Sequence, residues 1–200
     1  LALGFLLVAL LGPIYPFVLN RIERGGLQIM FVLDLSQSME EGMGKGKPVA
    51  APVQQATRPG VAPVKSASKM DAVKASAIEF INKRPGDALG LVVFSNNSYL
   101  VAPATFDHES LLSYLKMVNT QSLVNEGFTA IGEGLFMAQQ FFAFSKERGQ
   151  RSKGQVIVLL TDGDNNYGRD PMKELEKARL EATRVSFLGV ALEPGASQAI

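Results

Sequence analysis

The sequence contains no cysteine and a single histidine among its 200 residues. The absence of cysteine excludes disulfide bonds and thiolate metal sites, and it is compatible with either a reducing cytoplasm or an exported protein that needs no covalent cross-links. A metal site built on several histidines is excluded as well. Oxygen ligands therefore come first when a metal site is sought in this chain.

The chain also lacks an excess of charge of either sign, because its formal net charge is +1. This balance argues against a nucleic-acid-binding protein that works through a broad basic surface. Apolar residues, by contrast, make up 46% of the 200 residues. This content suffices for one substantial hydrophobic core, so we expect a single domain with an appendage.

The first 20 residues, LALGFLLVALLGPIYPFVLN, contain no charged side chain. A stretch of this length crosses the ~30 Å hydrocarbon core of a bilayer as a helix, so we predict a membrane anchor over residues 1–20. Pro13 and Pro16 predict that its last part bends. A signal-peptide core and a buried globular helix are the alternatives. Because the chain begins at Leu1 rather than Met, we expect a further segment upstream.

After this segment, short apolar runs alternate with longer stretches of helical periodicity. The predicted strands are 27–33, 88–94, 98–102, 155–161 and 184–192. The predicted helices are 68–83, 129–144 and 170–183. This alternation predicts a doubly wound, mostly parallel, Rossmann-like α/β sheet with helices on both faces. The short SNNS segment between the second and third strands predicts a hairpin, so one edge strand should be antiparallel.

Two of the predicted helices carry recognisable start signals. Ser68 and Asp71 form a capping-box pattern at the first helix. Asp170 and Pro171 have the N-cap and first-turn positions of the last one.

One segment breaks the alternation of strand and helix. Residues 40–67 are rich in Pro, Ala, Gly and Lys and have no usable periodicity, so we predict a long flexible insertion. The fragment GMGKGKP within it resembles a phosphate loop in composition only, because Lys47 is followed by Pro48 rather than by Ser or Thr.

Polar residues follow two of the predicted strands, where the chain leaves the sheet. Asp34 follows the first strand, and Ser36 and Ser38 come at alternate positions after it. Asp162 follows the strand at 155–161. In an open α/β sheet, ligands bind beyond the carboxyl ends of the strands, where the strand order reverses. Two carboxylates brought together there raise each other's pKa unless they share a cation.

A shared metal ion would resolve this repulsion. Thr129, at the start of a predicted helix, can add a third hydroxyl to those of the two serines. Hydroxyl, carboxylate and water oxygens suit a hard octahedral cation, so we expect Mg²⁺ first, with Mn²⁺ or Ca²⁺ as alternatives. An interpretation without a metal also remains open, in which the carboxylates cap loops and the serines form turns.

Three short motifs carry a resemblance to a known family. DLSQS at 34–38, the isolated Thr129 and TDG at 161–163 resemble the three parts of the metal-ion-dependent adhesion site of von Willebrand factor A (VWA) domains. The resemblance covers about residues 27–192, with the motifs in the family's order and at the ends of predicted strands. It implies the VWA fold for the predicted sheet.

The resemblance also implies roles for the individual residues. Ser36, Ser38 and Thr129 would bind the metal directly. Asp34 and Asp162 would hold it mainly through water. An acidic residue of a protein partner would then fill the open coordination position.

A narrower resemblance connects the chain to bacterial membrane-anchored VWA proteins that are found with MoxR-type AAA+ ATPases. It rests on the apolar first segment and on GLQIMFVLDLSQSM, LGLVVFSNNSYLVAP, GFTAIGEGL and VIVLLTDGDNN. It implies a membrane protein, within a multi-subunit complex, whose domain at 21–200 lies on the periplasmic or otherwise extracytoplasmic side. Gln37 departs from the Gly that is frequent there, and the insertion at 40–67 replaces a short connection. Because the chain stops at Ile200, we expect the family's last helix and strand to be missing.

Two classes of function compete for this chain. The first is a non-enzymatic binding module at a membrane, whose Mg²⁺ recruits a carboxylate of a partner and whose insertion, beginning after Met39, contacts that partner. In a variant of this hypothesis the chain is a structural subunit of a membrane complex, with a vestigial or architectural metal site. The second class is a Mg²⁺-dependent phosphatase of the haloacid-dehalogenase type. That chemistry needs a second Asp two positions after the first, and Ser36 at this position favours the binding module.

Overall fold

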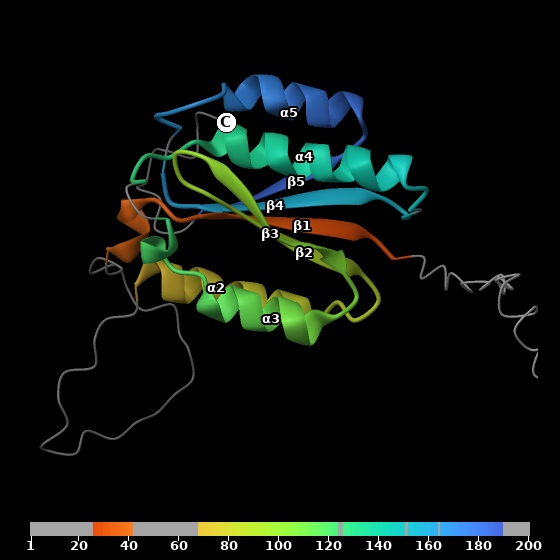
Figure 1. Ribbon diagram of the computed structural model, residues 1–200, viewed down its shortest axis with the longest axis horizontal. Helices are drawn as coiled ribbons and strands as arrows, with labels where there is room; N and C mark the ends of the chain where they lie inside the picture. Colours follow the sequence, from red (N-terminus) through yellow and green to blue (C-terminus); the bar gives the residue numbers. More distant parts are fainter. Residues whose placement is uncertain (1–25, 42–67, 124–125, 151, 164, 190–200) are drawn as a thin grey trace, which may run out of the picture.

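The computed structural model describes residues 26–41, 68–123, 126–150, 152–163 and 165–189, which form a five-stranded sheet between helices (Figure 1). The strands are β1 (Gln28–Asp34), β2 (Ala88–Phe94), β3 (Ser98–Thr105), β4 (Gln155–Thr161) and β5 (Arg184–Gly189). Their order in the sheet is β3-β2-β1-β4-β5. Only β3, at one edge, runs antiparallel to its neighbour. The predicted mostly parallel sheet with one antiparallel edge strand is confirmed.

Helices cover both faces of this sheet, as predicted. They are α2 (Lys69–Asn82), α3 (His108–Met117), α4 (Ile131–Glu147) and α5 (Pro171–Leu180), with two short 3-10 helices, η1 (Gln37–Glu40) and η2 (Thr120–Ser122). Figure 1 shows α2 and α3 on one face and α4 and α5 on the other. The capping box at the start of α2 and the N-cap Asp170 of α5 are also confirmed.

The central strand β1 explains why its sequence is apolar at nearly every position. Alternate side chains of a strand point to opposite faces of the sheet, and both faces of β1 are covered. Ile29 and Phe31 pack in one core, together with residues of α2 and α3. Met30 and Val32 pack in a second core, together with residues of α4. A strand buried on both faces leaves its carboxyl end as the place for polar side chains.

The first turn of α4 lies unusually close to the sheet because it contains Gly134. A Cβ atom added at this position would lie 2.6 Å from the Val32 side chain and 2.9 Å from the Phe94 side chain. Glycine is therefore required for the helix to approach β1 and β2 so closely. As a result, the loop that precedes α4 is held beside the carboxyl ends of these two strands.

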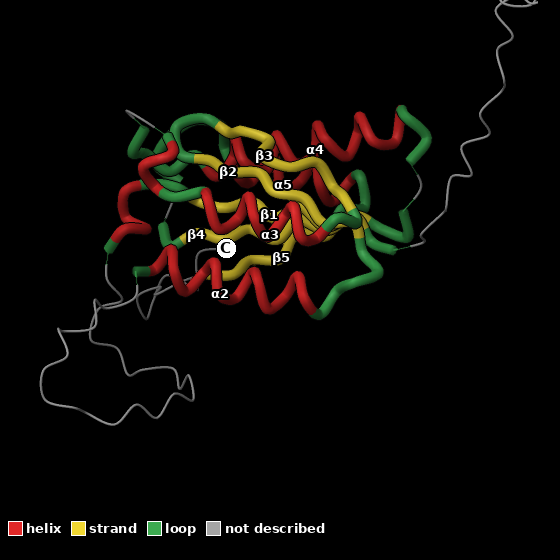
Figure 2. Tube along the Cα trace, turned by 60° about the horizontal axis from the view of Figure 1, so that its bottom comes forward, coloured by secondary structure: helices red, strands yellow, loops and turns green. Residues whose placement is uncertain are grey.

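The carboxyl ends of β1 and β4 lie at the point where the strand order reverses. The chain runs from β1 outward through β2 to β3, and then returns to the other side of β1 with β4. The loops after these strands, the two 3-10 helices and the start of α2 gather at one end of the sheet, on the left in Figures 1 and 2. This is the edge at which ligands bind in open α/β sheets.

Several predictions from the sequence fall on residues outside the described ranges. These include the membrane anchor at 1–20, most of the insertion at 40–67, and the chain beyond residue 189. Within the described ranges, no helix has both the length and the apolar character needed to cross a membrane. The first two residues of the predicted insertion are described. Glu40 closes η1, and the backbone N–H of Glu41 donates to the Ser38 carbonyl.

Candidate metal centre

Asp34 is the last residue of β1, and it is fully buried. Its Oδ1 atom accepts a hydrogen bond from the backbone N–H of Ser36 at 2.8 Å, and its Oδ2 atom accepts one from the Thr161 hydroxyl at 2.5 Å. Thr161 ends the neighbouring strand β4. Both strands that meet at the reversal point therefore contribute to fixing this carboxylate.

Burial raises the pKa of the Asp34 carboxyl above its ordinary value. The hydrogen bonds from Thr161 and Ser36 work in the opposite direction but do not outweigh burial, and the charge of Asp162 raises the pKa further. The two carboxylates therefore influence each other. A divalent cation between them would favour their charged forms.

Ser36 and Ser38 connect the loop after β1 to the loop after β4. Their two Oγ atoms lie 3.0 Å apart, and the Ser38 hydroxyl donates to Oδ1 of Asp162 at 2.8 Å. Ser36 is only 1% exposed. Gln37, between the two serines, is exposed, as expected if only the alternate positions turn towards a ligand.

Asp162 is also buried, since its side chain is 1% exposed, but it has a charged neighbour. The Lys69 ammonium, on the first residue of α2, lies 2.7 Å from Oδ2 of Asp162 and 3.3 Å from Oε2 of Glu41. Partial burial works to lower the pKa of Lys69, but the two carboxylates outweigh it and raise that pKa above its ordinary value. The lysine stays charged and neutralises Asp162.

Thr129 brings the third segment to the same place. It is buried, in the loop just before α4, and its hydroxyl oxygen lies 3.8 Å from where a Cβ atom of Gly163 would be. The Asn166 side chain accepts from the Thr129 N–H at 2.8 Å, and the Asn166 N–H donates to the Thr129 carbonyl at 3.0 Å. On the other side, the Ala130 N–H donates to the Ser95 carbonyl after β2. The loop carrying Thr129 is therefore held between the ends of β2 and β4.

The structure thus brings together all five residues predicted for the site, on three loops at one edge of the sheet. In the part of the chain that the structure describes, no group of three or more His, Cys, Asp or Glu side chains could hold a metal. The candidate centre instead combines two carboxylates with three hydroxyls. Such neutral and anionic oxygens suit Mg²⁺, Mn²⁺ or Ca²⁺, so the donor set fits a hard divalent cation.

Sequence reasoning missed residues that support the site. Thr161 lies in the TDG motif and at the end of a predicted strand, but its hydrogen bond to Asp34 was not predicted. Asn166 was assigned no role in the site, but its side chain holds the Thr129 loop. Nothing in the sequence indicated that Lys69 contacts the site, because a lysine in a first helical turn is ordinarily exposed and its partner Asp162 is 93 residues away.

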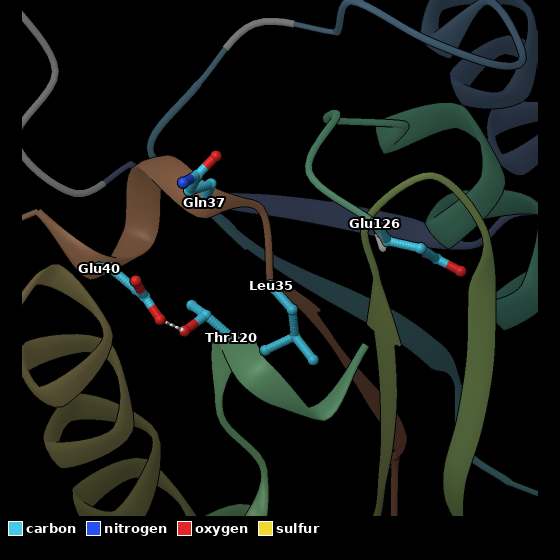
Figure 3. A pocket seen from close by; sticks show the side chains of 5 residues that line it. All are labelled: Leu35, Gln37, Glu40, Thr120 and Glu126. Carbon is cyan, nitrogen blue, oxygen red and sulfur yellow. Dashed lines mark hydrogen bonds between the residues drawn. The ribbon is translucent and has the colours of Figure 1, made fainter. Parts of the chain in front are cut away.

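A cavity of about 260 Å³ borders the same loop (Figure 3). It is lined by Leu35, Gln37, Glu40, Thr120 and Glu126. The Glu40 carboxylate accepts from the Thr120 hydroxyl, and Glu126 points away from the other four side chains, towards Asn97 and Tyr99, which donate to it. Because Glu126 points away from Glu40 and from the other lining side chains, the two carboxylates of this cavity do not converge, and it is a weaker candidate for a metal than the edge between Asp34 and Asp162.

A doubly wound sheet that gathers carboxylate and hydroxyl oxygens at its reversal point has the architecture of an α/β domain in which ligands bind beyond the strand ends. The chain belongs to the von Willebrand factor type A domain family, which matches residues 29–165. It is 31% identical over 173 residues to the UPF0353 protein of Mycolicibacterium paratuberculosis. That match covers 86% of this chain and 44% of the other protein, so the chain spans less than half the length of this relative.

Two solved structures illustrate the fold. An aerotolerance-related membrane protein from Bacteroides fragilis, with multiple mutations to serines, is 25% identical to this chain, with a TM-score of 0.63. That match covers 82% of this chain and 68% of the Bacteroides chain. Proximal thread matrix protein 1 from the mussel byssus, with a zinc-occupied MIDAS motif, is 21% identical with a TM-score of 0.59. That match covers 82% of this chain and 38% of the mussel protein. The second likeness concerns the fold alone.

Proposed function

We propose that this chain is a membrane-anchored VWA domain that binds a protein partner through a divalent metal, Mg²⁺ in the first place. Ser36, Ser38 and Thr129 would hold the metal with their hydroxyls, and Asp34 and Asp162 would complete the protein's share. When bound, the metal supplies a Lewis-acidic position for a carboxylate of the partner. The observation that carries this proposal is the meeting of these five residues at the reversal point of the sheet.

The side chains of this site prepare it for a cation rather than for catalysis. Hydrogen bonds from the loop after β1 and from the end of β4 hold Asp34 and Asp162 in place at the end of the sheet. At the position two residues after Asp34, a phosphatase of the haloacid-dehalogenase type needs a carboxylic acid, and Ser36 cannot supply one. We therefore propose a binding function without catalysis.

The membrane setting is part of the same proposal. It is supported by the charge-free segment at residues 1–20 and by the similarity to an aerotolerance-related membrane protein. The zinc-occupied MIDAS motif of the mussel protein supports the idea that this fold can hold a divalent ion. A place outside the cytoplasm, and a MoxR-type ATPase in the same multi-subunit complex, are proposals that rest on the resemblance of sequence.

The proposal is tested by capturing partners from detergent-solubilised membranes with the full 200-residue chain, in Mg²⁺ and in EDTA. We expect a defined set of proteins to be retained in Mg²⁺ and released by EDTA. The same proteins should be lost with Asp34→Ala. If Asp34→Ala abolished Mg²⁺ binding but retained the same partners, the site would be architectural and the domain a structural subunit.

A matched control is available at the other end of the strands. Asp87 accepts the Leu27 N–H at the amino-terminal end of the strands, far from the candidate centre. Asp87→Ala removes a carboxylate from the same sheet and should leave Mg²⁺-dependent capture unchanged. Loss of capture in both variants would point to a general effect of folding instead.

A further inference from the structure

We propose that Lys69 is a built-in competitor of the metal, whose ammonium occupies Asp162 until a divalent cation displaces it towards Glu41. This inference rests on the proposed metal centre and adds a residue that sets its affinity. Lys69 would act on the metal through Asp162 and not as a ligand, because an ammonium group has no lone pair to donate.

The first observation is how closely the lysine engages the carboxylate. Nζ of Lys69 lies 2.7 Å from Oδ2 of Asp162, while Oδ1 of the same carboxylate accepts from Ser38. The Asp162 side chain is 1% exposed and that of Lys69 is 14% exposed, so water screens this pair only weakly. Both oxygens of Asp162 are therefore in use before any metal binds.

The second observation is that the ammonium has another anionic group within reach. Oε2 of Glu41 lies 3.3 Å from Nζ, and its side chain is 71% exposed. The backbone N–H of Lys69 also donates to the Glu41 carbonyl at 3.2 Å, which holds the two residues together. The lysine can thus leave Asp162 for Glu41 by a small movement of its side chain, without entering water unpaired.

Charge decides the direction of the effect. A fixed positive charge beside a ligand carboxylate repels a divalent cation, and it also neutralises the charge that attracts that cation. Among the described residues, Lys69 is the one cation within ion-pair distance of Asp162. Removing its charge should therefore tighten metal binding, whereas a residue that merely positioned Asp162 would weaken binding when removed.

The test is a titration of the full chain with Mg²⁺ and with Mn²⁺. Calorimetry measures the binding of both ions, and the electron paramagnetic resonance signal of free Mn²⁺ gives a second measurement for that ion. We expect Lys69→Met to bind both ions roughly tenfold more tightly than the wild type, given the close approach of the charges. Lys69→Arg, which keeps the charge, should stay within about threefold of the wild type. Lys83→Met, which removes an exposed lysine paired with Glu79, is the control and should change nothing.

Glu41→Gln tests whether Glu41 accepts the displaced ammonium. In the wild-type background, this test does not depend on the folding of Lys69→Met. By removing the alternative acceptor it should weaken Mg²⁺ binding about two- to threefold in the wild type, and it should have no effect in the presence of Lys69→Met. Thermal unfolding gives an independent readout. In EDTA, Lys69→Met should unfold at a lower temperature than the wild type, because Asp162 has lost its counter-charge, and Mg²⁺ should raise its unfolding temperature by more.

Each outcome separates this inference from the proposed function. Equal or weaker Mg²⁺ binding by Lys69→Met, with the wild type binding normally, would overturn the inference and leave the metal centre intact. If neither protein bound Mg²⁺ or Mn²⁺, the metal centre itself would be disproved, and this inference with it. Binding by Lys69→Met alone would support the inference most strongly.

Discussion

The two carboxylates of the candidate centre are placed alike but neutralised differently. Asp34 ends β1 and Asp162 follows the neighbouring parallel strand β4, at the same end of the sheet, and both side chains are buried. Among the described residues, the donors to Asp34 are neutral and include the Ser36 N–H and the Thr161 hydroxyl. Asp162 has a lysine as well as a serine.

The two carboxylates therefore differ in their electrostatic surroundings. At Asp162 the charge is balanced by Lys69, so burial is compensated. At Asp34 it is not, and burial raises the pKa of the carboxyl. Burial of the charged Asp34 carboxylate therefore opposes folding at neutral pH, and a cation bound beside it would reduce this cost.

The largest expected effect is on metal binding by Asp34→Asn. We expect Mg²⁺ affinity to fall at least about 100-fold, since the uncompensated charge is lost. In EDTA, the free energy of unfolding should stay within about 1 kcal/mol of the wild type or rise, because an amide is cheaper to bury than a carboxylate. Calorimetry and urea unfolding in EDTA measure the two quantities. A large loss of stability would show that Asp34 is structural.

The same substitution at the other carboxylate should reverse the stability result. Asp162→Asn leaves the Lys69 ammonium without its buried partner, so we expect unfolding in EDTA to become easier by about 1–3 kcal/mol. The measurement is again urea unfolding in EDTA, beside Asp34→Asn. If both variants changed stability equally, the distinction between the two carboxylates would be wrong.

A smaller effect on the free energy of unfolding is expected at Thr161, which donates a hydrogen bond to Asp34 from the neighbouring strand. Its hydroxyl donates to Asp34 and accepts from the Gly163 N–H at 3.2 Å. Thr161→Val removes both bonds at a buried position and should cost about 1–2 kcal/mol of unfolding free energy. Thr161→Ser keeps the hydroxyl and should recover most of this loss. Chemical denaturation of the two variants side by side checks the prediction.

The smallest expected effect on the free energy of unfolding is at Glu126. This residue adds a third carboxylate to the comparison. Burial acts to raise its pKa, but hydrogen bonds from Tyr99 and Asn97 outweigh burial and lower the pKa below its ordinary value. Its stabilising contribution is therefore present above the carboxyl's ordinary pKa and is lost as the pH falls through the lowered value. Glu126→Gln should cost about 0.5–1.5 kcal/mol at neutral pH. In urea unfolding, this cost should disappear in acid; a cost that persisted there would contradict the assignment.

The sheet was predictable because its strands are buried on both faces and therefore read as continuous apolar runs. All five predicted strands and the antiparallel edge are present: β2 and β4 have the predicted bounds, β1 is shifted by one residue, and β3 continues three residues further. The start of α4 differs by two residues, since it begins at Ile131 and leaves Thr129 in the loop before it. For α2, the sequence predicted the capping box but not the role of Lys69, the first residue of the helix.

The meeting of the five site residues followed from topology, because carboxyl ends of parallel strands share an edge. What did not follow was how each charge is balanced. The contact between Lys69 and Asp162 joins positions 93 residues apart, and its existence depends on how the first turn of α2 is seated against the sheet. No local pattern of the sequence encodes that seating. Side-chain partners across elements are therefore the part that only the structure supplies.

The central place of β1 has a mechanical consequence. The strand is hydrogen-bonded along its length to β2 on one side and to β4 on the other, both in parallel. A pull applied at its amino-terminal end, while a partner holds the loop at its carboxyl end, would act along the strand and load both ladders in shear at once. Many hydrogen bonds would then have to break together rather than one after another. Tension between the proposed anchor and the proposed partner would thus act along β1.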